Sequence, residues 1–336
     1  MSKILSILLV VSLLVSANLC YQNTFTQDLI KLAQKINSNP DSTWKSTEQI
    51  QHWKEGTAQD FQQLNGLYMS PSGASLPLVE TVADEIPENF DSREKWSKCE
   101  SIKEVRDQAN CGSCWAFSAA EAFSDRWCIA SGQKDQTRMS SQQILTCCDY
   151  CGNGCAGGWH NMAWVYFQES GAVSGNLYGQ DNYCQSYFLP PCDHHVKGPL
   201  GPCPPSVKQP ACSYECNSNF DGTYGSDRHY TVGSGMTNNN VKAMQTEIMT
   251  NGPIQGAFTV YSDFYTYKSG VYQHLEGDFQ GGHAIKILGW GVEDGTPYWL
   301  CANSWNTSWG EGGFFKILRG ANECGIEDTT AFGYVK

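Results

Sequence analysis

The sequence predicts an α+β protein with a helical first half and a β-rich second half. Hydrophobic residues make up 40% of the 336 residues and charged residues only 17%, which is enough apolar material for a sizeable core and too little charge for a disordered chain. Residues 114–131 have the apolar periodicity of a helix. Apolar stretches between glycine turns predict strands at residues 256–261, 283–290, 298–303 and 313–318.

The N-terminus has the pattern of a secretory signal peptide. Lys3 precedes an apolar run over residues 4–15, which is followed by small residues up to Ala17. A membrane anchor is the alternative, but this run is too short to span a bilayer comfortably. We therefore expect a signal peptide over residues 1–20, cleaved after Ala17 or after Cys20. No later stretch approaches transmembrane length.

Residues 21–85 differ in composition from the rest of the chain. Apart from Cys20 at their edge, every cysteine lies beyond position 98. The segment has helical periodicity over residues 29–36 and ends in a Pro/Ser/Gly-rich linker, residues 69–77. A cysteine-free, helical segment ahead of a disulfide-rich body fits a removable pro-segment, and a small N-terminal domain has the same appearance.

The charge and the cysteine content restrict the class of protein. The net charge is −12, and such an acidic surface argues against nucleic acid or anionic membrane as a partner. Sixteen cysteines are far more than a cytosolic enzyme of this size usually carries. We therefore expect a secreted or vesicular protein with disulfide bonds.

The helix predicted at residues 114–131 begins at a cysteine and stops at Gly132. Ala116, Ala119, Ala120, Phe123 and Trp127 fall on one of its faces. Cys111 and Cys114 form a Cys-x-x-Cys pair that is compatible with a redox disulfide. A redox pair usually has an aromatic residue before the first cysteine, whereas here Trp115 follows the second. The alternative is that Cys114 is a nucleophile, because a helix N-terminus favours a thiolate.

A thiolate nucleophile needs a base and a group that orients the base. His283 opens one predicted strand, and Asn303 closes the next. The asparagine carbonyl can accept a hydrogen bond from one imidazole N–H and leave the other ring nitrogen facing sulfur. Trp305 and Trp309 could shield that hydrogen bond from water.

These residues resemble the papain-like cysteine proteases, whose Cys-Gly-Ser-Cys-Trp signature is present at residues 111–115. The resemblance covers the chain after residue 85, and the preceding segment is similar to the family's inhibitory propeptide. It implies a papain-like two-domain fold, with a helical left domain, a β-barrel-like right domain and the active-site cleft between them. It also implies that Cys114 is the nucleophile, that His283 is base and acid, that Asn303 orients the histidine, and that Gln108 donates to the oxyanion.

The resemblance extends to the substrate contacts. Gly157 and Gly158 resemble the backbone strip that binds an extended substrate. Thr329 aligns with a glutamate that lets some relatives accept arginine in the main specificity pocket, so we expect an apolar P2 residue to be preferred, although Glu327 and Asp328 are adjacent. The implied substrate-binding residues are Gly157, Gly158, Trp159, His160, Ala257, Gly282, Ala284, Trp305 and Thr329.

A cysteine-flanked loop lies at residues 190–203. It could be a solvated disulfide loop or a metal-binding histidine pair, but no other ligand cluster accompanies it. It resembles the occluding loop of the cathepsin B branch of the family, whose two histidines, here His194 and His195, bind a substrate's C-terminal carboxylate. Asp107 would pin the loop through His194. An arginine–aspartate clamp of the family is replaced by Leu200 and Ser308, which predicts a loop that is easier to displace.

The resemblance also implies the cysteine pairing. The dense group at residues 147–155 could instead suggest zinc, but a signal peptide and abundant cysteines favour disulfides. We expect buried thiols at Cys301 and Cys324, and Asn306 begins a glycosylation sequon. The expected disulfides are Cys99–Cys128, Cys111–Cys155, Cys147–Cys212, Cys148–Cys151, Cys184–Cys216 and Cys192–Cys203.

Together these features predict a cysteine protease made as a preproenzyme, with a signal peptide at 1–20, a propeptide at 21–85 and a mature domain at 86–336. The expected partners are peptide and protein substrates, the chain's own propeptide and cystatin-like inhibitors. We expect a monomer in a lysosome or other acidic vesicle, or secreted, without cofactor or metal. The rival classes are a catalytically silent binding protein of the same fold and a thiol-disulfide oxidoreductase.

Overall fold

The structure is a computed structural model that describes residues 25–50, 58–69, 75–204 and 207–336. The predicted signal peptide and the centre of the predicted linker lie outside these residues. No helix within them is long and apolar enough to cross a membrane. After a first helix over residues 25–38, the helices are α2 (Ala58–Gln63), α3 (Ser92–Lys95), α4 (Glu100–Lys103), α5 (Cys114–Ala130), α6 (Ser141–Cys147), α7 (His160–Glu169) and α8 (Val241–Asn251).

Nine strands form one sheet in the described part of the chain. They are β1 (Trp44–Ser46), β2 (Phe90–Asp91), β3 (Gly233–Thr237), β4 (Ile254–Tyr261), β5 (Tyr267–Tyr272), β6 (Phe279–Glu293), β7 (Thr296–Ala302), β8 (Phe314–Leu318) and β9 (Thr330–Tyr334). The short 3-10 helices are η1 (Gly154–Ala156), η2 (Ser262–Thr266) and η3 (Glu323–Gly325). The helical first half and β-rich second half are thus as predicted, and the four predicted strands correspond to β4, β6, β7 and β8.

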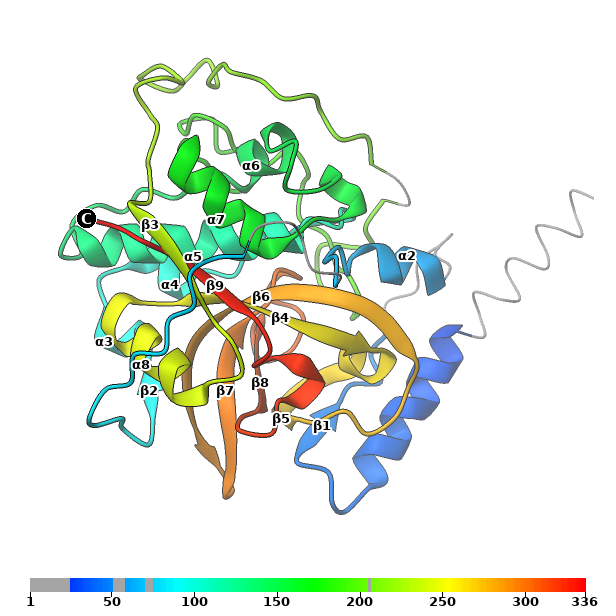
Figure 1. The fold of residues 1–336 in the computed structure, drawn as a ribbon. Helices are drawn as coiled ribbons and strands as arrows, with labels where there is room; N and C mark the ends of the chain where they lie inside the picture. The colour runs from blue at the N-terminus through cyan, green and yellow to red at the C-terminus, as the bar shows by residue number, and fades with distance from the viewer. Residues whose placement is uncertain (1–24, 51–57, 70–74, 205–206) are drawn as a thin grey trace, which may run out of the picture.

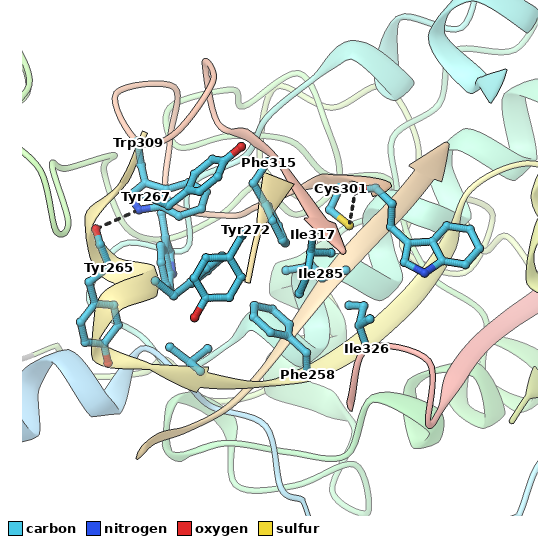
Figure 2. Packing of buried hydrophobic residues seen from close by; sticks show 14 of the residues in the cluster. Phe258, Tyr265, Tyr267, Tyr272, Ile285, Cys301, Trp309, Phe315, Ile317 and Ile326 are labelled. Atoms are coloured by element: carbon cyan, nitrogen blue, oxygen red, sulfur yellow. Dashed lines mark hydrogen bonds between the residues drawn. The ribbon is translucent and has the colours of Figure 1, made fainter. Parts of the chain in front are cut away.

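The sheet curves around an aromatic core but does not close into a barrel. Its order is β1-β5-β8-β7-β6-β4-β9-β3, with β2 pairing with β6, so β1 and β3 remain its two ends. Phe258, Tyr272 and Phe315 point into the space that the strands enclose (Figure 2). At the β3 end, α7 packs against β9, with Trp164 against Gly333.

Helix α5 runs between the sheet on one side and α6 and α7 on the other (Figure 1). The sequence predicted one buried face, but every residue from Cys114 to Arg126 is buried, and Trp127 of the predicted face is only half-buried. Two charged residues that α5 buries form ion pairs with residues of other elements. Lys286 Nζ lies 2.8 Å from Asp125 Oδ2, and Arg126 lies 2.8 Å from Glu247.

The described residues of the N-terminal segment, 25–50, 58–69 and 75–85, lie against the rest of the chain and do not form a separate unit. Its first helix buries Leu29, Ala33 and Ile36, as the periodicity predicted. Strand β1 pairs antiparallel with β5, and the Trp44 indole donates to the Gln273 carbonyl at 2.9 Å. From there the segment passes through α2 toward the helical half (Figure 1).

All six expected disulfides are present in the structure. Among the described residues, the reduced cysteines are Cys114, Cys301 and Cys324. Cys301 is buried as expected, whereas Cys324 was expected to be buried but is only half-buried. Because Cys111 is bonded to Cys155, the Cys-x-x-Cys pair is not a redox disulfide here. The pairs are Cys99–Cys128, Cys111–Cys155, Cys147–Cys212, Cys148–Cys151, Cys184–Cys216 and Cys192–Cys203.

Candidate active site

The site is built where the first turn of α5 meets the ends of β6 and β7. Cys114 is the first residue of α5, so its thiol lies at the positive end of a 17-residue helix. His283 lies in β6, and Asn303 directly follows β7, which pairs with β6. Because β6 and β7 form an antiparallel hairpin, their register brings His283 and Asn303 together at its open end.

The histidine and the asparagine are in direct contact. His283 Nε2 lies 2.8 Å from Asn303 Oδ1, which also accepts from the Ser304 N–H at 2.8 Å. His283 Nδ1 is buried and has no hydrogen-bond partner among the described residues. The Trp305 ring lies 4.8 Å from the imidazole and is buried, as expected for a shield over the pair. This arrangement fixes Nε2–H as the donor and leaves Nδ1 as the nitrogen available to a thiol.

Gln108 is held with its side-chain amide facing the N-terminal segment. The Ser304 hydroxyl donates to Gln108 Oε1 at 2.7 Å, which leaves Nε2 as a donor. That nitrogen donates to the Leu64 carbonyl at 2.9 Å and to the Cys111 carbonyl at 2.8 Å. A carbonyl of the N-terminal segment thus occupies the hydrogen-bonding position where an oxyanion would be expected.

The N-terminal segment forms backbone hydrogen bonds with Gly158 of the expected substrate strip and with Gly282. Gly158 N–H donates to Gly66 O at 2.9 Å and Gly158 O accepts from Tyr68 N–H at 3.0 Å, while Leu67 N–H donates to Gly282 O at 3.1 Å. Gly157 has φ +115°, and a Cβ there would lie 2.7 Å from the Tyr68 ring and 2.9 Å from Gly66 O. These glycines can therefore hold an extended chain by its backbone alone.

The N-terminal segment covers Cys114 and His283, and burial changes the pKa of both side chains. It raises the pKa of the Cys114 thiol to about 11, against the opposing effect of the Ala284 and Gly66 backbone groups. It lowers the pKa of His283 to about 4, although the bond to Asn303 acts in the other direction. At neutral and mildly acidic pH the covered site thus holds a thiol and a neutral imidazole rather than an ion pair.

A cavity of about 320 Å³ is lined by the N-terminal segment, including Tyr68 and Met69, and by four of the residues expected to form the specificity pocket. Ala284, which was also predicted to line it, does not, because that residue is buried and its backbone faces the Cys114 thiol. The sequence missed Met236 and Asp328 as lining residues. Glu327 faces away, and its carboxylate accepts from the Trp299 indole at 2.9 Å. The lining residues that were predicted are Trp159, His160, Ala257 and Thr329.

Asp107 ties the 190–203 loop to the active-site segment. Its Oδ1 lies 2.5 Å from His194 Nε2, and its Oδ2 accepts from the Cys192 N–H at 2.9 Å. Asp193 fastens the loop to itself, because its carboxylate accepts from the backbone N–H groups of Leu200 and Gly201. The loop is therefore anchored where the sequence predicted, and its backbone is tied down as well.

His195 is enclosed by aromatic rings. Its imidazole stacks on Tyr265 at 4.2 Å, meets the Trp305 edge at 4.2 Å and lies 5.0 Å from the Phe61 ring. Burial lowers its pKa well below the usual value, and the neighbouring His194 and His283 add to this effect. With Phe61 in place, this burial disfavours the protonated imidazole that carboxylate binding requires.

Asn306 is a loop anchor that the sequence analysis missed. Its Nδ2 donates to the Cys192 carbonyl at 2.5 Å and to Asp107 Oδ2 at 3.3 Å, and its side chain is buried. The only sequence signal at this position was the glycosylation sequon that Asn306 begins. Since the amide nitrogen that a glycan would modify is buried and bonded to the loop, the folded chain does not present it.

Within the described residues, one group of side chains has metal-ligand spacing. The ligand atoms of Cys192, His194 and Cys203 lie within 4.8 Å of one another. The two sulfurs are joined as a disulfide, and His194 is bonded to Asp107. A disulfide supplies no thiolate ligand, so these residues do not form a zinc donor set.

Comparisons with known proteins agree with this geometry. Residues 86–334 match the family described as "Papain family cysteine protease". The chain is 50% identical over 255 residues to cathepsin B-like cysteine proteinase 6 of Caenorhabditis elegans, covering 75% of this chain and 67% of the relative. It is 42% identical over 304 residues to a cathepsin B-like cysteine proteinase of Schistosoma japonicum, covering 90% and 89%.

Solved structures show the same similarity over nearly the whole chain. The fold matches proCathepsin B S9 from Trypanosoma congolense with a TM-score of 0.79 and 35% identity, covering 91% of this chain and 98% of that one. It matches digestive procathepsin L 3 of Tenebrio molitor with a TM-score of 0.69 at 20% identity, covering 94% and 92%, which shows the shared fold alone. The chain therefore belongs to the papain family of cysteine proteases and, within it, is a cathepsin B-like cysteine peptidase.

Proposed function

We propose that this peptidase cleaves peptide bonds by a Cys114–His283–Asn303 mechanism and is made as a zymogen. The observation that carries this proposal is the His283–Asn303 hydrogen bond of 2.8 Å in the site that contains Cys114, with residues 64–68 lying across it. The signal peptide at residues 1–20, the propeptide at 21–85 and the mature domain at 86–336 belong to the same proposal. So does delivery to a lysosome, to another acidic vesicle or out of the cell.

The chemistry follows from the atoms in the site once residues 21–85 are removed. Solvent then reaches Cys114 and His283, which permits the thiolate–imidazolium pair that burial suppresses. The thiolate attacks the peptide carbonyl carbon, and Gln108 Nε2 and the Cys114 N–H donate to the oxygen that gains negative charge. His283 protonates the departing amine, and a water molecule, deprotonated by His283, then hydrolyses the acyl-enzyme.

Release of C-terminal dipeptides is part of the proposal. The loop at 190–203, held by Asp107 and Asn306, closes one end of the cleft and carries His194 and His195. When the N-terminal segment leaves, His195 loses its contact with Phe61. A protonated imidazole there would bind a substrate's C-terminal carboxylate through a charge-assisted hydrogen bond.

The deciding experiment uses acid-activated protein with peptide substrates followed by mass spectrometry from about pH 4 to about pH 8. We expect sequential loss of C-terminal dipeptides at low pH and no cleavage by the Cys114→Ala variant. Internal cuts alone would support the proposed protease activity and contradict the proposed release of C-terminal dipeptides. No cleavage by either protein would favour the silent binding protein.

A further inference from the structure

The main chain that carries the oxyanion glutamine is strained and needs an external support. Ala109, directly after Gln108, has φ +49° although it is not a glycine, and it is fully buried. A left-handed conformation is unfavourable for alanine, so it persists only where its surroundings fix it. The segment from Gln108 to Ser113 is thus a tight bend that precedes the helix of the nucleophile.

Tyr187 fastens both ends of this bend with one hydroxyl group. Its O–H donates to the Gln108 carbonyl at 2.8 Å, and the Ser113 hydroxyl lies 3.1 Å from the same oxygen. Since the phenol has one proton, which Gln108 receives, Ser113 is the donor in the second bond, which is shorter than the 3.4 Å contact of the same hydroxyl with the Cys111 carbonyl. The tyrosine side chain is almost fully buried, and its ring packs edge-on against Phe117 of α5 at 4.6 Å.

The two residues that Tyr187 holds are those that place the two oxyanion donors. Gln108 carries the side-chain donor, and Ser113 immediately precedes Cys114, whose backbone N–H is the other donor. The Ser304 hydroxyl fixes the rotation of the Gln108 amide, but it does not contact the Gln108 carbonyl. The Gln108 N–H donates to the Ser304 carbonyl at 2.9 Å and the Ala109 N–H donates to Asp107 Oδ1 at 2.7 Å. The part of this main chain that the Tyr187 hydroxyl holds is therefore the Gln108 carbonyl.

We propose that Tyr187 is a positioning residue of the oxyanion site, which sets the distance between the Gln108 amide and the Cys114 N–H. This inference rests on the proposed role of Gln108. Removal of the hydroxyl would let the strained bend relax and move the amide, which weakens binding of the transition state more than binding of the substrate. It would leave Cys114 and His283 untouched, because neither contacts Tyr187.

The test is Tyr187→Phe in the activated enzyme, compared with Tyr166→Phe. Tyr166 is a buried tyrosine of the same half of the molecule, and its hydroxyl accepts from Gln143 at 2.6 Å, away from the site. For Tyr187→Phe we expect kcat for a peptide amide to fall roughly 5- to 30-fold, with KM changed less than about twofold. Tyr166→Phe should retain wild-type kcat.

Two further readouts separate positioning from a general structural effect. A dipeptidyl nitrile adds the Cys114 thiol across its carbon–nitrogen triple bond, and the adduct nitrogen takes the oxyanion position, so its Ki should rise about tenfold in Tyr187→Phe. The rate of Cys114 alkylation by iodoacetamide should stay unchanged. Difluorotyrosine at position 187, which keeps the hydroxyl, should restore kcat to within about twofold of the wild type.

The Gln108→Ala variant separates a failure of the role proposed for Tyr187 from a failure of the oxyanion role proposed for Gln108. If Gln108→Ala lowers kcat and weakens the nitrile but Tyr187→Phe does neither, the role assigned to Tyr187 is wrong. If Gln108→Ala itself leaves both values at the wild-type level, the proposed oxyanion role of Gln108 is wrong. A Tyr187→Phe variant whose alkylation rate falls as much as its kcat would show a general loss of structure and would also overturn the inference.

Discussion

Gln108 Nε2 donates to the carbonyl oxygen of Leu64 at 2.9 Å, so the N-terminal segment engages the same amide that would bind an oxyanion. The next residues, Asn65 to Tyr68, continue along the cleft and bond to Gly158 and Gly282. The segment thus uses the backbone contacts that an extended peptide would use. Inhibition by this segment is therefore expected to depend on how closely its backbone approaches the nucleophile.

Gly66→Ala should weaken that inhibition. A Cβ at position 66 would lie 1.9 Å from the Gly112 carbonyl oxygen. Because the nearest atoms all belong to the Gly112 backbone, they cannot turn aside as a side chain could. We expect a synthetic peptide of residues 21–85 that carries this change to inhibit the mature enzyme about 30- to 100-fold less well. Glu80→Ala, at an exposed position of the same segment, is the control and should inhibit normally. Equal inhibition constants for the Gly66→Ala peptide and the unmodified peptide would contradict the role of this contact.

Asp107→Ala should shift the enzyme from dipeptide release toward internal cleavage. The change removes the carboxylate that holds both His194 and the Cys192 N–H. Each of these two buried groups then lacks a hydrogen-bond partner, which costs roughly 1–3 kcal/mol. We expect the endo/exo ratio on a peptide with a free C-terminus to rise at least about fivefold. Asn306→Ala should shift it less, because Asp107 still holds the loop. An unchanged ratio in Asp107→Ala would show that this anchor does not control the loop.

Thr329 should make phenylalanine preferred over arginine at P2. Thr329 places no carboxylate at this position, so a guanidinium there would be desolvated with only Asp328, which also lines the pocket, as an ionic partner. We expect kcat/KM to favour phenylalanine over arginine at least about tenfold in matched fluorogenic substrates, and Thr329→Glu to reduce that preference. Asp328, at the pocket but bonded to Asn322 at 2.7 Å, is tested separately by Asp328→Asn. Equal turnover of the two substrates by the wild type would contradict the prediction.

Glu121 should make the protein less stable as the pH rises toward neutrality. Burial raises the pKa of this carboxyl to about 7, and the negative charge of Asp125 adds to the rise, while Lys286 opposes it. The folded state therefore binds more protons than the unfolded state above about pH 4.5. The contribution to stability is fully present below that pH and is lost as the pH rises through about 7.

The corresponding experiment compares Glu121→Gln with the parent protein, both in a Cys114→Ala background that prevents autolysis. Urea unfolding should give similar free energies near pH 4.5, whereas at pH 8 the glutamine variant should gain up to about 3 kcal/mol relative to the parent. A difference in free energy that does not change with pH would mean that Glu121 does not titrate in this range.

Much of the site could be predicted from short-range patterns. A cysteine at a helix start, a histidine at a strand start and an asparagine at the end of the next strand were readable because a hairpin brings neighbouring strand ends together. Gln108, Asp107 and the pocket residues came from the similarity of motifs to the papain-like family. Asn306, Met236 and Asp328 could not be found in this way, because their role depends on contacts with loops distant in sequence.

The sequence by itself determined the elements and the chemistry of this protein, namely the helix of Cys114, the four central strands and the residue types of a thiol protease. Local periodicity and composition carry that information, since they reflect which residues one element must bury. Only the tertiary structure decided that α5 is buried on all sides, that the sheet stays open and that Leu64 binds Gln108. These outcomes depend on the packing of segments that are far apart in the chain, and no local pattern specifies such packing.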